Sequence, residues 1–144
     1  MTVRRAEPRD ADGVLALLAG LGRPAVADDP LSQREVFAHH LTDPASAIYV
    51  AEENGQLAGV ASLWFRPRLN WTTREAWVPD LYVDPAHRRR GHARALLDAC
   101  VAAARDRGCH RLVLESGHDR TEAHGLYEGY GFVHGGRAYG LPLG

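Results

Sequence analysis

The spacing of apolar residues predicts helices in four parts of the chain. A helix with one buried face repeats its apolar side chains three and four positions apart. This pattern follows Asp10, and it returns behind Gly91 on a segment whose inner side carries Leu96 and small residues. Ser32 followed by Glu35 forms a capping box, which marks another helix start. The predicted helices span residues 11–19, 33–41, 91–107 and 121–130.

Apolar runs between these helices predict strands. Asn54-Gly55 separates two of the runs and is the strongest short signal for a hairpin. Pro79 interrupts a third run, which indicates a bulge or an unpaired edge, because proline cannot donate a ladder hydrogen bond. The predicted strands span residues 2–6, 48–53, 56–64, 76–83, 111–115 and 132–143. The order strand, two helices, three strands, helix, strand, helix, strand predicts a mixed α/β domain with one central sheet.

Composition and charge restrict the class of protein. Of the 144 residues, 45% are apolar and 24% are charged, as in ordinary globular proteins. The net charge of -1 argues against a nucleic-acid partner, since such proteins carry a basic surplus. No apolar run approaches the ~18 residues of a membrane span, and the N-terminus lacks the core of a signal peptide. We therefore expect a single cytoplasmic domain over residues 1–144, with Cys100 and Cys109 reduced and no membrane partner.

The segment that follows Val83 combines the features of an anion site. A strand ends there, Asp84-Pro85 turns the chain, and a helix begins near Gly91. A helix start offers unpaired N–H groups and the positive end of the helix dipole. Four basic residues surround it: Arg88, Arg89, Arg90 and Arg94. The arrangement predicts a turn that binds a pyrophosphate, and the alternative is a solvated basic turn.

Two motifs resemble signatures of the GNAT N-acetyltransferases. The run from Arg88 to Ala93 is similar to the acetyl-CoA motif of that family, written Gln/Arg-x-x-Gly-x-Gly/Ala. The run from Ala123 to Phe132, about 30 residues later, resembles its Ala-x-x-x-Tyr-x-x-x-Gly-Phe. The order of elements also matches, so the resemblance covers most of the chain. It implies the GNAT fold: a mixed, mostly antiparallel sheet with helices on both faces and a splayed strand pair that holds the cofactor.

The resemblance implies acetyl-CoA as a co-substrate and no metal. A backbone N–H of the strand before the first motif would bond the thioester oxygen, where charge develops. The Tyr127 hydroxyl would protonate the leaving thiolate, and its alternative role is to pack the last helix onto the sheet. The implied cofactor contacts are Leu81, Tyr82, Val83, Arg88, Arg89, Arg90, Gly91, His92, Ala93, Arg94, Ala123 and Tyr127.

The residue that deprotonates the amine is left open by the sequence. Period-two alternation places Asp80 on the same face of its strand as Tyr82. A chain of water molecules without any single base is an equal alternative. The adjacent His39 and His40 lack the i, i+4 spacing of paired metal ligands, so we expect no metal there. The candidate bases are Asp80, Glu115, His118 and His124.

The reaction implied is acetyl transfer to a primary amine of a small molecule by direct attack on the thioester. The chain also looks similar to a bacterial branch of the family that includes aminoalkylphosphonate acetyltransferases. Aromatic and basic residues around the loop 66–73 would receive an anionic amine: Trp64, Trp71, Trp77, Arg66, Arg68 and Arg74. The alternative is a solvated hairpin loop with core tryptophans. Alternative functions are acetylation of a protein N-terminus or lysine, and a non-catalytic acyl-CoA sensor. The Gly-rich segment 135–143 is a place where a homodimer would pair.

Overall fold

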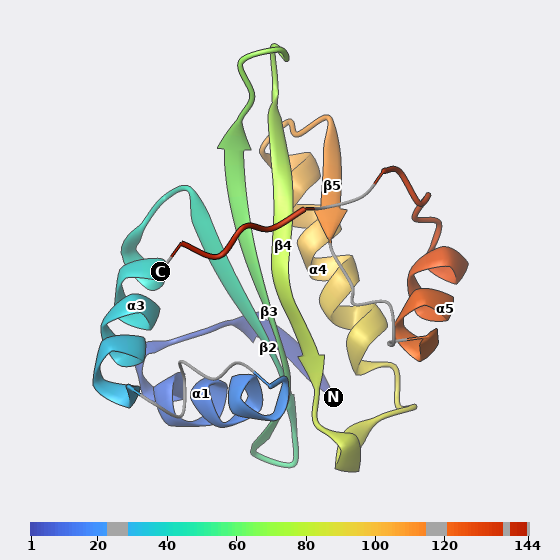
Figure 1. Ribbon diagram of the computed structural model, residues 1–144. Helices are drawn as coiled ribbons and strands as arrows, with labels where there is room; N and C mark the ends of the chain where they lie inside the picture. Colours follow the sequence, from blue (N-terminus) through green and yellow to red (C-terminus); the bar gives the residue numbers. More distant parts are fainter. Residues whose placement is uncertain (23–28, 115–120, 137–138, 144) are drawn as a thin grey trace. The chain divides into compact units, whose positions relative to one another are not determined.

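The computed structural model describes residues 1–22, 29–114, 121–136 and 139–143. Five strands form one open sheet in the order β1-β2-β3-β4-β5. Neighbours among the first four pair antiparallel, whereas the arrows of β4 and β5 point the same way in Figure 1. The expected mixed, mostly antiparallel sheet is therefore confirmed. The strands are β1 (Thr2–Arg5), β2 (Ser46–Glu53), β3 (Gln56–Pro67), β4 (Arg74–Val83) and β5 (Arg111–Leu114).

Helices cover both faces of this sheet. The helices are α1 (Ala11–Gly20), α3 (Pro30–Thr42), α4 (His92–Asp106) and α5 (Thr121–Tyr130), with short 3-10 turns η1 (Pro8–Asp10) and η2 (Pro85–His87). On one face α1 and α3 enclose an apolar cluster with the strands: Val14, Leu17, Phe37, Ile48, Val50, Val60 and Tyr82. The opposite face is covered by α4 (Figure 1). No helix within the described ranges is long and apolar enough to span a bilayer.

Gly59 allows α4 to approach the sheet closely. A Cβ at this position would lie 2.9 Å from the carbonyl oxygen of Tyr82 and 3.1 Å from Cδ1 of Leu96. Gly59 and Val60 are neighbours on β3 and so face opposite sides of the sheet. The contact with Leu96 therefore places α4 behind the apolar cluster of α1 and α3, with the sheet between them.

The bulge predicted at Pro79 is confirmed. The register of β3 and β4 changes from Ser62 opposite Asp80 to Trp64 opposite Trp77. Two residues of β4, the second of them Pro79, thus face one residue of β3, which is the definition of a bulge. The hairpin turn is confirmed as well, with positive φ angles of 53° at Asn54 and 78° at Gly55.

Two local predictions are wrong. Helix α3 begins at Pro30 and is capped by Asp29, whose carboxylate accepts hydrogen bonds from the N–H of Ser32 at 3.1 Å and its hydroxyl at 2.8 Å. Ser32 is thus bound by the cap instead of being the cap, and proline at the first helical position suits this start. The last predicted strand is not formed in residues 132–136 or 139–143. Apolar side chains in these segments, such as Val133 and Leu141, are exposed, so they are not buried as the inner face of a strand would be.

Contacts within the chain divide it into two units, Met1–Val113 and Leu114–Gly144. The first unit contains the helices on both faces and most of the sheet. The second contains α5 and the segment that carries the second sequence motif. Each unit is described below by itself.

Candidate active site

The turn between β4 and α4 has the form of an anion-binding site. Gly91 precedes the helix with a φ of +83°, a left-handed conformation that favours glycine. The first backbone bond of α4 runs from the N–H of Ala95 to the carbonyl of Gly91 at 3.0 Å. The N–H groups of the three residues between them therefore have no carbonyl partner within the helix. We call residues 88–94 the cradle; the N–H groups at its helix start and the positive end of the helix suit a phosphate group.

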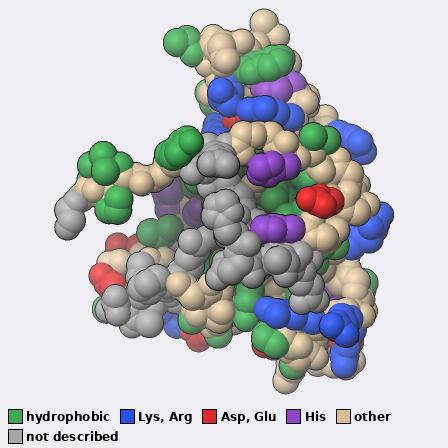
Figure 2. Space-filling model, turned by 45° about the vertical axis from the view of Figure 1, so that its right-hand side comes forward, with side chains coloured by type: hydrophobic (Ala, Val, Ile, Leu, Met, Phe, Trp, Pro, Cys, Tyr) green, Lys and Arg blue, Asp and Glu red, His purple; other side chains and the backbone are tan. Residues whose placement is uncertain are grey.

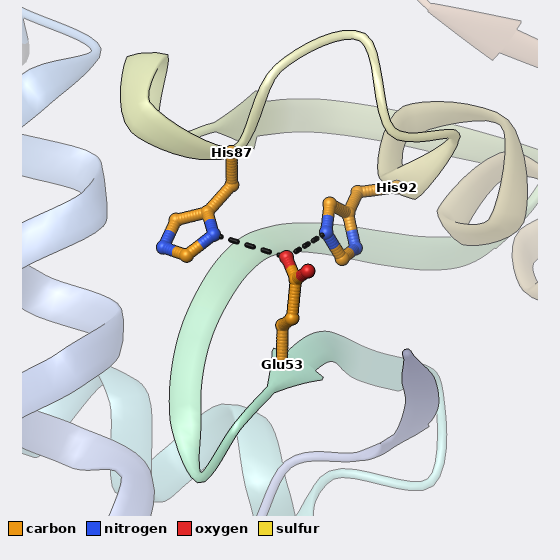
Figure 3. A group of neighbouring side chains, drawn as sticks. All are labelled: Glu53, His87 and His92. Atoms are coloured by element: carbon orange, nitrogen blue, oxygen red, sulfur yellow. Dashed lines mark hydrogen bonds and ion pairs between the residues drawn. The ribbon is translucent and has the colours of Figure 1, made fainter.

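Glu53, at the end of β2, anchors the cradle from below (Figure 3). Its Oε2 lies 2.9 Å from Nε2 of His92 and 3.1 Å from Nδ1 of His87, and its Oε1 accepts a bond from Arg90 at 3.0 Å. The bonds from His92 and His87, with the charge of Arg90, lower the pKa of Glu53 to about 2. The carboxylate of Glu53 thus connects the β2–β3 hairpin to three parts of the next turn. These are η2 through His87, the turn before α4 through Arg90, and the buried first residue of α4, His92.

Glu53, His87 and His92 also offer three ligand-type atoms within 4.8 Å of one another. Both imidazoles, however, meet the same carboxylate oxygen. Arg90 and the N-terminus of α4 place positive charge beside that oxygen, which disfavours a cation. The group therefore suits an anchor for an anion-binding turn better than a metal site.

The last residues of β4 present backbone groups on the side away from β3. The N–H of Asp84 donates to the carbonyl of Ala58 at 2.8 Å, and Tyr82 lies opposite Val60. Hydrogen-bonded pairs alternate along an antiparallel ladder, so Tyr82 exchanges its bonds with β3. Leu81, Tyr82 and Val83 were expected to offer a backbone N–H to the cofactor. The N–H groups of Leu81 and Val83 point away from β3, whereas that of Tyr82 points toward it.

A hollow of about 110 Å³ opens on the α1 and α3 face of the sheet, over the middle of β3 and β4. Its two ionisable side chains are Asp80 and His40. The Oδ2 of Asp80 accepts a hydrogen bond from the hydroxyl of Ser62 at 2.9 Å. Asp80 shares this face with Tyr82, as the sequence predicted. We call this hollow the pocket; its lining is Val14, Leu15, Leu18, Gln33, Val36, Phe37, His40, Ile48, Val60, Ser62 and Asp80.

Two of the three arginines predicted to receive an anionic substrate have an internal partner. Glu75 is fully buried and accepts bonds from Arg66 at 3.0 Å, Arg68 at 3.1 Å and Arg111 at 2.7 Å. Burial by itself would raise the pKa of Glu75, but the three guanidinium groups hold it at about 2. Figure 2 shows arginine side chains in separate groups on one face of the molecule. Glu75, with the arginines bound to it, lies at the start of β4, whereas the cradle follows the end of β4.

Comparison with known proteins agrees with this arrangement. Residues 15–132 match the model of the acetyltransferase (GNAT) family. The chain belongs to the GNAT acetyltransferase family. It is 33% identical over 135 residues to aminoglycoside N(6')-acetyltransferase type 1 of Stenotrophomonas maltophilia, a match that covers 91% of this chain and 85% of that protein. The family indicated by the two motifs is therefore confirmed, and the protein is an acetyltransferase.

Solved structures share the GNAT fold of this chain. A putative acetyltransferase from Agrobacterium tumefaciens has a TM-score of 0.86 at 28% identity, covering 99% of this chain and 100% of that one. An aminoglycoside N-acetyltransferase in complex with CoA has a TM-score of 0.81 at 17% identity, covering 99% and 98%. The GNAT fold neighbours thus include a structure that binds CoA.

The second GNAT motif lies on and behind α5, in the unit Leu114–Gly144. Tyr127 is buried, and its ring meets that of Phe132 edge to face at 6.0 Å. The N–H of Phe132 donates to the carbonyl of Tyr127 at 3.0 Å, which closes the motif on itself. Ala123 and His124 are half-buried on the same helix. Glu115 and His118, two of the candidate bases, lie outside the described residues.

Sequence reasoning missed two residues of the site, Glu53 and His40. Nδ1 of His40 lies 2.5 Å from Oγ of Ser46, and its ring lies 4.3 Å from that of Trp64. Burial lowers the pKa of His40, while the charge of Asp80 raises it. No local pattern marks either residue, because their partners come from distant parts of the chain.

Proposed function

We propose that this GNAT protein uses acetyl-CoA to acetylate a primary amine of a small, cationic molecule. The observation that carries the proposal is the layout of β4. One face of the strand presents Asp80 to the pocket, the N–H groups of Leu81 and Val83 point to the side away from β3, and the cradle follows directly. Acceptor, thioester and pyrophosphate sites would therefore follow one another along a single stretch of chain.

The cradle would hold the pyrophosphate of the co-substrate. The free N–H groups of Ala93 and its neighbours, with the positive end of α4, would bind its oxygens. Arg89 and Arg90 would add charge at the rim. Arg88 has another task, because its Nε donates to the carbonyl of Val83 at 3.1 Å and so fixes the turn against β4.

The thioester would lie along the edge of β4. An N–H of Leu81 or Val83 would bond the carbonyl oxygen, where negative charge develops as the amine attacks. The nitrogen–carbon bond forms and the carbon–sulfur bond breaks, so the sulfur leaves as a thiolate that needs a proton. Tyr127 would supply that proton, as the family motif implies.

The pocket favours an acceptor that carries positive charge. Its walls are mostly apolar, and among its lining residues the one acidic side chain is Asp80. Arg66 and Arg68, two of the three arginines that would have attracted an anionic amine, are bound to Glu75 instead. A carboxylate in an otherwise apolar wall attracts an ammonium group and repels a phosphonate. The similarity to an aminoglycoside N(6')-acetyltransferase supports the same class of acceptor.

A thiol-release assay with acetyl-CoA tests this proposal. The panel holds aminoglycosides, polyamines, amino acids, aminoalkylphosphonates and a set of N-terminal and lysine peptides. We expect saturable release with a cationic small amine and none with phosphonates. In Asp80→Asn, the KM for that amine should rise about 10- to 100-fold, the worth of one charge-assisted hydrogen bond. Asp106→Asn, at an exposed aspartate on α4, is the matched control.

The other outcomes would each change the function. Turnover with peptides alone would make the protein a peptide acetyltransferase. Tight binding of acetyl-CoA without any acceptor would indicate an acyl-CoA sensor. Failure to bind acetyl-CoA at all would overturn the proposal.

A further inference from the structure

His40 lies where a base for the acceptor amine would be needed. It comes from the last turn of α3 and lines the pocket, whereas Asp80 comes from β4 and lines the same pocket. An acceptor amine drawn into the pocket by Asp80 would therefore meet an imidazole in the same small volume. This argument depends on the proposed function, since it concerns the amine of that reaction.

The imidazole is held in one orientation by two contacts. Its Nδ1 lies 2.5 Å from Oγ of Ser46, a side chain that is 1% exposed. Its ring lies 4.3 Å from the ring of Trp64, at an angle of 56°. Ser46 fixes the ring at Nδ1 and Trp64 fixes it at the ring face, so Nε2 is the nitrogen left for proton exchange. In the hydrogen bonds between described residues, His40 takes part through Nδ1 and not through Nε2.

The surroundings of the ring keep it neutral at physiological pH. Burial lowers the pKa of His40 from 6.5. Asp80 on β4 and Asp43, directly after α3, raise the pKa, and His39 on α3 lowers it, but burial prevails. Ser46 and Trp64, which contact the ring from β2 and β3, carry no charge. A neutral imidazole is suited to accept a proton from an amine.

We propose that His40 is the general base of the acetyl transfer and that Asp80 holds the acceptor ammonium beside it. Nδ1–H of His40 donates to Oγ of Ser46, and Nε2 carries the lone pair. The ammonium first gives one proton through Nε2 to solvent, which frees the lone pair of its nitrogen. As the amine nitrogen then bonds to the thioester carbon, a second proton passes to Nε2. The carbon–sulfur bond breaks, and the thiolate takes a proton from Tyr127 or solvent. His40 then returns its proton to solvent, so the products are the N-acetyl amine and free CoA.

The pH dependence of kcat at saturating amine tests this assignment. The wild type should lose activity as the pH falls through the pKa of His40, because the protonated ring cannot accept a proton. His40→Gln should lower kcat by about 10²–10⁴-fold, the range of general acid–base catalysis, and should lack this acidic limb. The KM for acetyl-CoA should stay unchanged. In Asp80→Asn the limb should remain but move to lower pH, since the charge that raises the pKa of His40 is gone.

His39→Gln is the matched control. His39 is adjacent to His40 on the same helix, but its side chain is 71% exposed. This variant should keep the wild-type kcat and its acidic limb. His40→Ala with added imidazole gives a second comparison, because partial recovery of kcat would show that a free base replaces the missing ring. A His40→Gln enzyme with wild-type kcat and an intact acidic limb would overturn the assignment while leaving the proposed function in place.

A measurement without turnover separates this inference from the proposed function. Nitrogen NMR of the imidazole side chains reports which ring nitrogen carries the proton in the neutral form. We expect Nδ1–H for His40, and we expect its titration to shift to lower pH in Asp80→Asn. A proton on Nε2, or a titration that Asp80→Asn leaves unmoved, would refute the base even if no acceptor in the panel were turned over.

Discussion

The two sites along β4 hold their polar groups in different ways. In the cradle, charged side chains bind one another, and the single carboxylate of Glu53 contacts His87, Arg90 and His92. In the pocket, a carboxylate and an imidazole line a mostly apolar wall: Asp80 accepts a hydrogen bond from the hydroxyl of Ser62, and Nδ1 of His40 contacts the hydroxyl of Ser46. The cradle is braced by opposite charges before any ligand arrives. The pocket instead combines one carboxylate with hydroxyl and imidazole groups in a mostly apolar wall.

This difference matches what each site is proposed to recognise. A pyrophosphate is common to every CoA thioester, and backbone N–H groups fixed by a helix start can bind it. An acceptor amine differs from one enzyme to the next, so its recognition depends on a few side chains in a shaped hollow. The comparison predicts that changes in the cradle affect cofactor binding alone, and that changes in the pocket affect the amine and the proton.

The strongest test of the cradle is Ala93→Asp. An acidic residue in the first turn suits the helix dipole, so the fold should not lose stability. The same charge would face the pyrophosphate, and like charges in contact cost several kcal/mol. We expect the affinity for acetyl-CoA, measured by calorimetry, to fall about 100-fold or more. Ala93→Asn, of nearly equal size but neutral, should lose much less; wild-type affinity in Ala93→Asp would refute the cradle.

Tyr127→Phe tests the proton supplied to the thiolate. The ring would keep its contact with Phe132, and acetyl-CoA should bind as before. Turnover should fall by about 10²–10⁴-fold, the range of general acid catalysis. Tyr130→Phe is the control, since Tyr130 lies on the same helix and its ring is 5.8 Å from that of Phe132. Equal turnover in wild type and Tyr127→Phe would leave Tyr127 with a packing role.

The sequence predicted those features that depend on neighbouring residues. Asn54-Gly55 specifies the hairpin turn, Pro79 specifies the bulge, and Gly91 specifies the start of α4. The glycine and asparagine act through their own backbone angles, and the proline acts because it has no N–H to donate. The start of α3 was wrong for a related reason. Asp29 and Ser32 are both good caps, and the preference for Asp29 depends on Pro30 at the next position.

The side chains of the site were harder to predict, because their partners are far apart in the chain. Glu53 is 34 residues from His87 and 39 from His92. His40 depends on residues from three different strands. The basic residues near the loop 66–73 had the composition of an anion site, but Glu75, buried beneath them, gives them a structural role. Charge alone could not distinguish an arginine with an internal partner from one that awaits a ligand.

Glu53→Gln gives a smaller effect and separates positioning from contact. Glutamine keeps the size of the side chain but loses the charge that holds His92, His87 and Arg90 together. We expect the KM for acetyl-CoA to rise about 3- to 10-fold, the worth of one hydrogen bond, with kcat at saturation unchanged. Glu52→Gln, at the neighbouring residue that pairs with Arg4, should leave both constants unchanged. A fall in kcat alone would contradict a positioning role.

The smallest effect concerns the stability of the cradle anchor at acid pH. The pKa of Glu53 is lowered from 4.5 to about 2 in the folded protein. Its contribution to folding is therefore complete above the unfolded pKa and is lost as the pH falls from about 5 toward 2. Over this range the unfolding free energy of the wild type should fall more steeply than that of Glu53→Gln, as measured by urea unfolding. Glu75 titrates in the same range in both proteins, so its effect cancels in the difference. Parallel curves would mean that the bonds of Glu53 to His87 and His92 do not stabilise the fold, and that the cradle keeps its shape through Gly91 and the turn alone.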